Sequence, residues 1–257
     1  MKIVLIGAGN VGHHLGLAIH QSDAEVIQVI GRKAKKTSHL AKILNCSYST
    51  NIDEISQDAE VYLLAVPDDQ ILKVAESLPL GKTASQIIAH TSGGTALGVL
   101  GDLFSNFGVF YPLQTFTIGR KLEFSQIPVC LESNNEETLT KLTSLAEKVS
   151  QKVYFLDSEK RAKIHLAAVF ANNFTNHMLA KAEQYCSSEN LEFEILKPLI
   201  KETVAKAMTI NPSIAQTGPA RRNDSKTIWT HLDLLKDDPQ LSKLYWEVTR
   251  SIENFYD

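Results

Sequence analysis

Three glycines near the N-terminus have the spacing of a phosphate-binding loop. The segment Gly7-Ala8-Gly9-Asn10-Val11-Gly12 follows an apolar run and precedes a helical pattern. In such a loop the first glycine allows a sharp turn, the second lets the backbone approach a pyrophosphate, and the third lets the next helix pack closely. The helix N-terminus adds free N–H groups and partial positive charge. The order of strand, loop and helix therefore predicts that these six residues bind a dinucleotide.

A second cofactor contact is expected where the next apolar run, 25–30, ends. An enzyme that uses NAD(H) places an acid there, about twenty residues after the loop, to bind the ribose 2′-OH. This chain has Gly31, Arg32 and Lys33 and no acid. An arginine can bind a 2′-phosphate with two parallel hydrogen bonds, whereas a carboxylate would repel it. The residues favour NADP(H) over NAD(H); the alternative is a solvated, basic start of a helix.

Two further segments follow expected strands. Ala65 and Val66 end the run 60–66, and Pro67 follows it. We expect these three residues beside the phosphates and ribose of the cofactor, because ligands of parallel sheets bind at the carboxyl ends of strands. His90 and Ser92 follow the next run and would reach the same edge. A histidine is a candidate general acid, since its ordinary pKa lies near neutrality. The alternative is a histidine that only orders its loop.

The C-terminal half also carries polar side chains that suit a cleft. His165 and Asn172 are seven residues apart and share a face of an otherwise apolar helical pattern, where polar groups need partners. Arg221 and Arg222 follow a Gly-Pro turn, and arginine forks suit carboxylate or phosphate. We expect His90 or His165 to be the general acid. Ser92 and Asn172 would orient the substrate, and Arg221 or Arg222 would bind its carboxylate.

The elements that must position these residues alternate over the first half of the chain. The expected strands are 3–6, 25–30, 60–66, 87–89, 109–110, 126–132 and 152–156, and the helices between them are 11–20, 34–44, 70–77 and 136–149. This alternation is typical of an α/β protein with a doubly wound parallel sheet.

Strand patterns stop after Asp157. Helical patterns cover 158–186, 191–210 and 241–255, and Pro198 either kinks the second or divides it. We therefore predict a dinucleotide-binding domain, 1–157, and an all-helical domain, 158–257, for substrate binding and dimerisation. The segment Ile164–Leu179 is apolar on more than one face, and such a helix must be buried. A homodimer through the helical domains would bury it.

The composition excludes several other classes. The formal net charge of −3 disfavours a general nucleic-acid binder. Cys46, Cys130 and Cys186 are far apart, and a sparse odd count fits a reducing cytosol. No apolar stretch is long enough to cross a membrane, and no Cys/His cluster suggests a metal. We expect a cytoplasmic protein that binds a small-molecule substrate, with no nucleic acid, membrane or metal partner.

Several motifs occur together and in order: the glycine loop, Ala65 to Asp69, His90-Thr91-Ser92-Gly93, Tyr111 to Phe116, Asn172-Asn173 and Thr217 to Asp224. With these the chain resembles a bacterial Rossmann-like family whose C-terminal helical part is a domain of unknown function. More distantly it resembles pyrroline-5-carboxylate reductase and the β-hydroxyacid dehydrogenases, including 6-phosphogluconate dehydrogenase.

The resemblance implies a Rossmann-type sheet, an NADP(H) or NAD(H) cofactor and dimerisation through the helical domain. It does not carry over the lysine of the hydroxyacid dehydrogenases, because Ala168 and Val169 stand where that lysine would precede an asparagine. The leading expectation is an NADP(H)-dependent oxidoreductase acting on a small imine, carbonyl or hydroxy acid. The alternative is a non-catalytic NADP(H)-binding sensor or regulatory protein.

Overall fold

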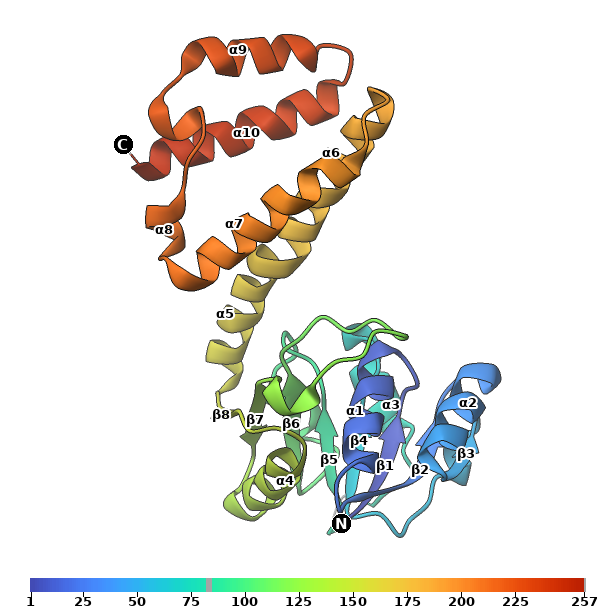
Figure 1. The fold of residues 1–257 in the computed structure, drawn as a ribbon. Helices are drawn as coiled ribbons and strands as arrows, with labels where there is room; N and C mark the ends of the chain where they lie inside the picture. The colour runs from blue at the N-terminus through green and yellow to red at the C-terminus, as the bar shows by residue number, and fades with distance from the viewer. Residues whose placement is uncertain (82–84, 257) are drawn as a thin grey trace. The chain divides into compact units, whose positions relative to one another are not determined.

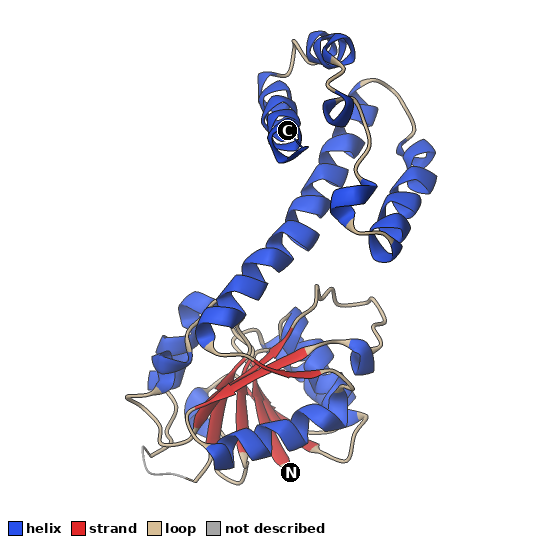
Figure 2. Ribbon diagram, turned by 90° about the vertical axis from the view of Figure 1, so that its left-hand side faces the viewer, coloured by secondary structure: helices blue, strands red, loops and turns tan. Residues whose placement is uncertain are grey.

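The computed structural model describes residues 1–81 and 85–256. The chain forms two compact units, Met1–Asn172 and Asn173–Asp257. Among the described residues, every strand belongs to the first unit, and the second unit contains helices and loops (Figures 1 and 2). The predicted class, a Rossmann-type α/β sheet followed by a helical region, is confirmed.

One eight-stranded sheet forms the centre of the first unit. Its spatial order is β3-β2-β1-β4-β5-β6-β7-β8, and all neighbours are parallel except β6 and β7. The strands are β1 (Lys2–Ile6), β2 (Glu25–Ile30), β3 (Ser47–Ser49), β4 (Val61–Leu64), β5 (Ile87–His90), β6 (Phe107–Pro112), β7 (Val129–Ser133) and β8 (Val153–Phe155). The strand order reverses direction at β1 and β4, and the crevice at such a switch point is the usual ligand site of these sheets.

Helices cover both faces of this sheet. Buried side chains of α1 (Asn10–His20), α2 (Ala34–Leu44) and α4 (Glu136–Val149) share one apolar core with the sheet. On the other face Ile71 and Ala75 of α3 (Ile71–Glu76) join a second core. The sheet is therefore buried on both sides, which explains why its strands read as continuous apolar runs rather than as alternating patterns.

The predicted elements of the first unit occur, with two differences. The strand β3 was not predicted, because three residues are too few for a pattern to show. The pair β6 and β7 is antiparallel, whereas the sequence predicts a parallel sheet. The segment between them contains only a 3₁₀ turn, Phe124–Gln126, and an antiparallel neighbour needs no crossover helix.

The long helical pattern after Asp157 is interrupted once. The side chain of Asp157 accepts the Lys160 N–H at 2.8 Å and caps α5 (Ser158–Ala168). A π-helical turn, Val169–Phe174, follows, and then α6 (Thr175–Ser188). The two compact units divide within this turn, after Asn172. The functional domain boundary at residue 157 stays a prediction.

The second unit is built from α6 and four later helices. They are α7 (Lys197–Thr209), α8 (Pro212–Ala215), α9 (Ser225–Leu234) and α10 (Pro239–Tyr256). Pro198 lies in the first turn of α7, after the 3₁₀ turn Phe193–Leu196. Of the two predicted effects of this proline, it therefore divides the helical pattern, since proline fits a helix at its first turn but not in its interior.

Candidate functional site

The glycine loop between β1 and α1 is shaped by close backbone contacts. Gly7 has a φ of +114°, and a Cβ on it would lie 2.1 Å from the carbonyl oxygen of Ala65. A Cβ on Gly12 would lie 2.0 Å from the carbonyl oxygen of Gly7. A Cβ on Gly9, in contrast, would meet nothing within 4 Å. The outer two glycines are required by the fold, and the space beside Gly9 is open to a ligand.

The N-terminus of α1 lies beside this opening. Its cap residue, Gly9, provides no side-chain hydrogen bond, and the first turn contains no acid. Free N–H groups and the positive end of the helix dipole suit an anion. The loop geometry and this donor set together fit a pyrophosphate. The glycine spacing predicted this loop because it reflects local backbone geometry, and the binding of a dinucleotide by the loop stays a prediction.

The edge beyond β2 carries the second group of predicted cofactor residues. The Gly31 N–H donates to the Ser49 carbonyl at 3.1 Å, which joins the ends of β2 and β3. Lys33 is the cap residue of α2 and gives no side-chain hydrogen bond. Arg32 and Lys33 are exposed, and within the described residues neither forms an ion pair. The predicted Arg32 therefore has a free guanidinium at the expected strand end.

A basic groove of about 940 Å³ adjoins the glycine loop. Its lining residues come from the loop, α1, α2, β3 and the segment after β6, and they are Ala8, His13, Lys35, Lys36, Ser38, His39, Lys42, Tyr48 and Ile118. No acid is among them, and Arg32 is not either. Burial lowers the pKa of His13, and His14 and His39 lower it further. Its three lysines give the groove a positive charge that suits a phosphate group. Lys42 and the two histidines extend it beyond the basic residues noted in the sequence.

The end of β4 forms the opposite side of the loop. Ala65 donates its N–H to the Ile6 carbonyl at 2.8 Å, and its own carbonyl lies against Gly7. Val66 and Pro67 follow and lead into a 3₁₀ turn, Asp68–Gln70. The structure therefore places Ala65 against the glycine loop, with Val66 and Pro67 directly after it in the chain; their contact with a cofactor stays a prediction.

His90 ends β5 and is completely buried. Its Nδ1 accepts the Ser92 N–H at 3.2 Å. Its Nε2 lies near the Ala96 backbone but has no hydrogen-bond partner among the described residues. Burial, and then the charge of Arg161, lower the pKa of His90 to about 4. His90 is therefore neutral near pH 7, with its proton on Nε2.

Ser92 orders the loop that follows β5. Its hydroxyl oxygen accepts the Gly94 N–H at 3.1 Å and the Thr95 N–H at 2.9 Å. Two backbone donors on one buried hydroxyl make a tight local turn. The contacts of Ser92 in this structure are those of a residue that shapes the loop beneath His165.

His165 of α5 lies over this loop and contacts Tyr111. Its Nδ1 is 3.1 Å from the Tyr111 hydroxyl, and the two rings meet edge to face. A Cβ on Gly93 would lie 2.6 Å from the Tyr111 ring and 2.7 Å from His165 Nδ1. The structure thus brings two predicted segments, the His90 loop and the His165 helix, into contact. Tyr111 was noted in a motif but was not predicted as a site residue, because its partner lies 54 residues away.

A buried ion pair holds α5 against the sheet. The Arg161 guanidinium binds the Glu132 carboxylate and the Thr95 carbonyl. Ser158 donates its hydroxyl to Glu132 at 2.8 Å and accepts the Leu97 N–H at 2.9 Å. This network joins β7, the loop after β5 and the first turns of α5. It therefore fixes the part of α5 from which His165 projects.

The remaining predicted residues are Asn172, Arg221 and Arg222. Asn172 is exposed in the π-helical turn and is the last residue of the first unit. Arg221 and Arg222 belong to the second unit, where the Arg221 guanidinium stacks 4.4 Å from the centre of the Tyr256 ring. The roles predicted for these three residues stay predictions.

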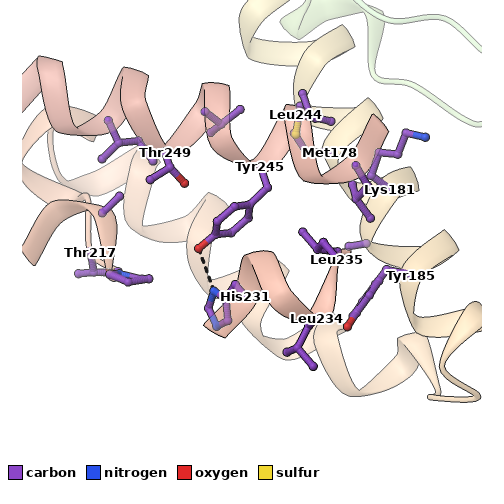
Figure 3. Close-up of a pocket in the computed structure, with 17 residues that line it drawn as sticks. Met178, Lys181, Tyr185, Thr217, His231, Leu234, Leu235, Leu244, Tyr245 and Thr249 are labelled. Carbon is purple, nitrogen blue, oxygen red and sulfur yellow. Dashed lines mark hydrogen bonds between the residues drawn. The ribbon is translucent and has the colours of Figure 1, made fainter. Parts of the chain in front are cut away.

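The second unit has a cavity of its own, of about 560 Å³. Side chains of α6, α9 and α10 surround it, and most are apolar, such as Met178, Leu235 and Leu244 (Figure 3). Its polar feature is the His231 Nδ1 and Tyr245 hydroxyl pair, 2.9 Å apart. The cavity contains no predicted site residue.

Within residues 1–81 and 85–256 no group of three or more His, Cys, Asp or Glu side chains could hold a metal ion. In the same residues no helix combines the length and the apolarity that a membrane crossing needs. Neither finding adds a ligand to the site described above.

A parallel sheet with a glycine loop after its first strand defines a Rossmann-like domain. Residues 1–113 match the model of the Rossmann-like domain, and residues 127–252 match the model described as Domain of unknown function (DUF2520). A solved structure from Bacteroides fragilis, named a "putative NADP oxidoreductase", is 36% identical with a TM-score of 0.91 and covers 98% of each chain. The chain therefore belongs to the family that joins a Rossmann-like domain to DUF2520. No curated protein matches the chain.

More distant solved structures share the fold. A reductive aminase from Aspergillus terreus, in complex with NADPH and ethyl levulinate, is 13% identical with a TM-score of 0.73, covering 100% of this chain and 96% of its own. The 1-pyrroline-5-carboxylate reductase of Streptococcus pyogenes is 13% identical with a TM-score of 0.63, covering 99% of this chain and 98% of its own. Both bear out the architecture predicted from the motifs.

Proposed function

We propose that this protein is an NADP(H)-dependent oxidoreductase acting on a small imine, carbonyl or hydroxy acid. The observation that carries the proposal is the acid-free basic groove that adjoins the glycine loop. A dinucleotide with a 2′-phosphate needs two anion sites, one for the pyrophosphate and one for the extra phosphate. The loop at Gly9 and the groove with Lys35 and Lys36 supply this pair of sites.

Different residues would bind different parts of the cofactor. The first turn of α1 would hold the pyrophosphate, and Ala65, Val66 and Pro67 would lie along the ribose. Arg32, Lys33 and the groove lysines would bind the 2′-phosphate, since none of them forms an ion pair among the described residues. When bound, the nicotinamide supplies or accepts the hydride, and the protein positions it.

The geometry favours His165 over His90 as the proton donor. His90 is completely buried with a pKa near 4, so it is a poor acid near neutrality. His165 is partly exposed beside the loop after β5. As hydride reaches a carbonyl carbon, the π electrons move to oxygen, and the imidazolium form of His165 would pass its Nε2 proton to that oxygen and become a neutral imidazole. For a hydroxy acid the same atoms would move in the opposite direction.

The names of the distant relatives support an imine or carbonyl substrate. One is a reductive aminase solved with a keto ester, and another reduces a cyclic imine by its name. In this chain Ser92 shapes the loop under the proposed donor. Asn172 would orient the substrate, and Arg221 or Arg222 would bind a substrate carboxylate, as proposed from the sequence.

The second unit supports a homodimer as part of this proposal. Many large apolar side chains are left largely exposed on its helices, including Ile195, Leu199, Met208, Ile214, Trp229 and Phe255. Soluble monomers rarely expose apolar area on this scale. A second copy of the chain would cover these side chains.

The proposal is tested by calorimetry with NADPH and NADH, followed by a panel of small imines and ketones with NADPH. We expect tighter binding of NADPH and loss of NADPH absorbance with at least one compound class. The His165→Ala variant should bind NADPH as the wild type does but turn over about a hundredfold more slowly. Equal affinity for both cofactors would contradict the NADP(H) assignment. Tight NADPH binding with no turnover of any compound would favour the sensor alternative.

A further inference from the structure

Tyr111 and His165 form a side-chain pair that joins the end of β6 to α5. The hydroxyl and Nδ1 are 3.1 Å apart, and the ring centres are 6.0 Å apart at 73°. Tyr111 is buried beside Cys130 and Val109, whereas His165 is partly exposed. The phenol is therefore the fixed member of the pair, and the imidazole is the member that a ligand can reach.

We infer that Tyr111 is a positioning residue that fixes the ring orientation of His165 and decides which of its nitrogens carries the proton. The inference rests on the proposed function in one respect: it gives His165 the outward Nε2–H that a proton donor needs. The pair itself is a feature of this chain's own geometry.

The phenol can act as the donor in this hydrogen bond at neutral pH. Burial, and then the charges of Cys130 and Asp68, raise the pKa of Tyr111 to about 12, against a smaller opposing effect of Arg161. The phenol thus keeps its proton at neutral pH and can donate it to Nδ1. A neutral imidazole that accepts at Nδ1 carries its own proton on Nε2. When the ring is an imidazolium, Nδ1–H donates to the phenol oxygen, so the contact is kept while Nε2 gives up its proton.

Asp68 is a charged group that borders the outer side of the pair. A Cβ on Gly94 would lie 3.6 Å from Asp68 Oδ2 and 3.8 Å from His165 Cδ2, so both atoms border the same small space. Asp68 forms no ion pair among the described residues. Arg161, the buried cation on the same helix as His165, is bound to Glu132. Arg161 is therefore already paired, and Tyr111 is the hydrogen-bond partner of His165 Nδ1.

Gly93 makes room for the pair. A side chain there would need the space within 2.7 Å of His165 Nδ1 and within 2.6 Å of the Tyr111 ring, whereas a Cβ on Gly94 would make only ordinary contacts. Neither glycine has a positive φ, so the two differ in space rather than in backbone strain. The Gly93→Ala and Gly94→Ala variants are thus a matched pair that adds the same methyl group with and without displacing the imidazole.

The test is ¹⁵N NMR of the His165 ring in the full chain without ligand. We expect the wild type to show a proton on Nε2 and an Nδ1 shift typical of a hydrogen-bond acceptor. Tyr111→Phe keeps the ring volume and removes the hydroxyl, so the Nδ1 resonance should move to that of a free acceptor and the proton should spread over both nitrogens. Gly93→Ala should act in the same direction, and Gly94→Ala should match the wild type.

Two results would overturn the inference: a wild-type spectrum with the proton on Nδ1, or a Tyr111→Phe spectrum that matches the wild type. The wild-type spectrum alone is decisive if a variant fails to fold. NADPH titration of Tyr111→Phe separates this inference from the proposed function. Normal NADPH binding together with a changed His165 spectrum supports both the inference and the proposed function. If the wild type does not bind NADPH, the proposed cofactor is refuted, whereas the NMR result for His165 remains valid.

Discussion

The Arg161 guanidinium and the Glu132 carboxylate form an ion pair with 1% and 15% of their side-chain surfaces exposed. The pair joins α5 to β7, and Ser158 and the Thr95 carbonyl complete its hydrogen bonds. The Ser158 hydroxyl also accepts the Leu97 N–H, so this network ties the start of α5 to the loop after β5. The position of His165 one turn later therefore depends on this pair.

Replacing Arg161 should be costly for this reason. Arg161→Met leaves a carboxylate and a carbonyl without their buried partner, and we expect a loss of about 3–5 kcal/mol in the free energy of unfolding. Lys163→Met is the matched control, because the Lys163–Glu159 pair on the same helix is exposed and should change stability by less than about 1 kcal/mol. Urea titration of both variants checks the difference. Similar losses would contradict a structural role for the buried pair.

The glycine loop offers a second contrast. Gly9→Val should leave the thermal unfolding temperature nearly unchanged, since a Cβ there meets nothing within 4 Å, but it should abolish NADPH binding by filling the pyrophosphate space. Gly12→Ala should lower the unfolding temperature, because its Cβ would collide with the Gly7 carbonyl. Calorimetry and thermal melts distinguish the two. NADPH binding by Gly9→Val with wild-type affinity would count against the whole cofactor site.

The basic groove should determine the preference for a 2′-phosphate. Lys35→Ala or Lys36→Ala should each weaken NADPH binding by roughly tenfold and leave NADH binding unchanged, because only NADPH brings the extra charge. Arg32→Ala tests the contact predicted from the sequence in the same way. Lys73→Ala on α3 removes an equal charge from a helix that does not line the groove and is the control. A uniform effect of all four variants would indicate general electrostatics rather than a site.

His90 should make the protein sensitive to mild acid. Its folded-state pKa, about 4, lies below the ordinary 6.5, so the unfolded chain takes up a proton first as pH falls through this window. Stability is fully present above 6.5 and is lost toward 4, by roughly 3 kcal/mol for a shift of this size. His90→Gln should lose this part of the pH dependence. Urea titrations of both proteins across the window check it, and parallel curves would show that His90 does not titrate as described.

The exposed apolar side chains of the second unit should be covered in solution. We expect light scattering at micromolar concentration to give the mass of a dimer. Replacing Met208 and Ile214, both largely exposed, with glutamate should yield a monomer that keeps its helical content. A monomeric wild type would remove dimerisation from the proposed function and leave the cofactor site unaffected.

Much of the first unit could be predicted because its signals are local. The bounds of α2 and α4 coincide with the helices expected from periodicity, and the glycine loop lies where its spacing indicated. Each depends on residues that are close together in the sequence. In the loop a glycine allows a sharp turn of the backbone, and in the helices apolar residues recur at the helical period. The end of β2 without an acid is a local signal of the same kind.

The candidate catalytic cluster was only partly predictable. The sequence offers His90 and His165 equally as candidate proton donors, and only the structure distinguishes them. His90 is enclosed beside Arg161, whereas His165 is partly exposed and bound to Tyr111. The roles of Tyr111, Gly93 and the Arg161–Glu132 pair depend on residues that are far apart in the chain and are brought together by the sheet order and by α5. The sequence by itself determined most elements of the first unit and the glycine loop, because both arise from short-range backbone geometry. Tertiary structure decided which polar side chains contact one another and which are buried from solvent, because burial and pairing depend on long-range packing.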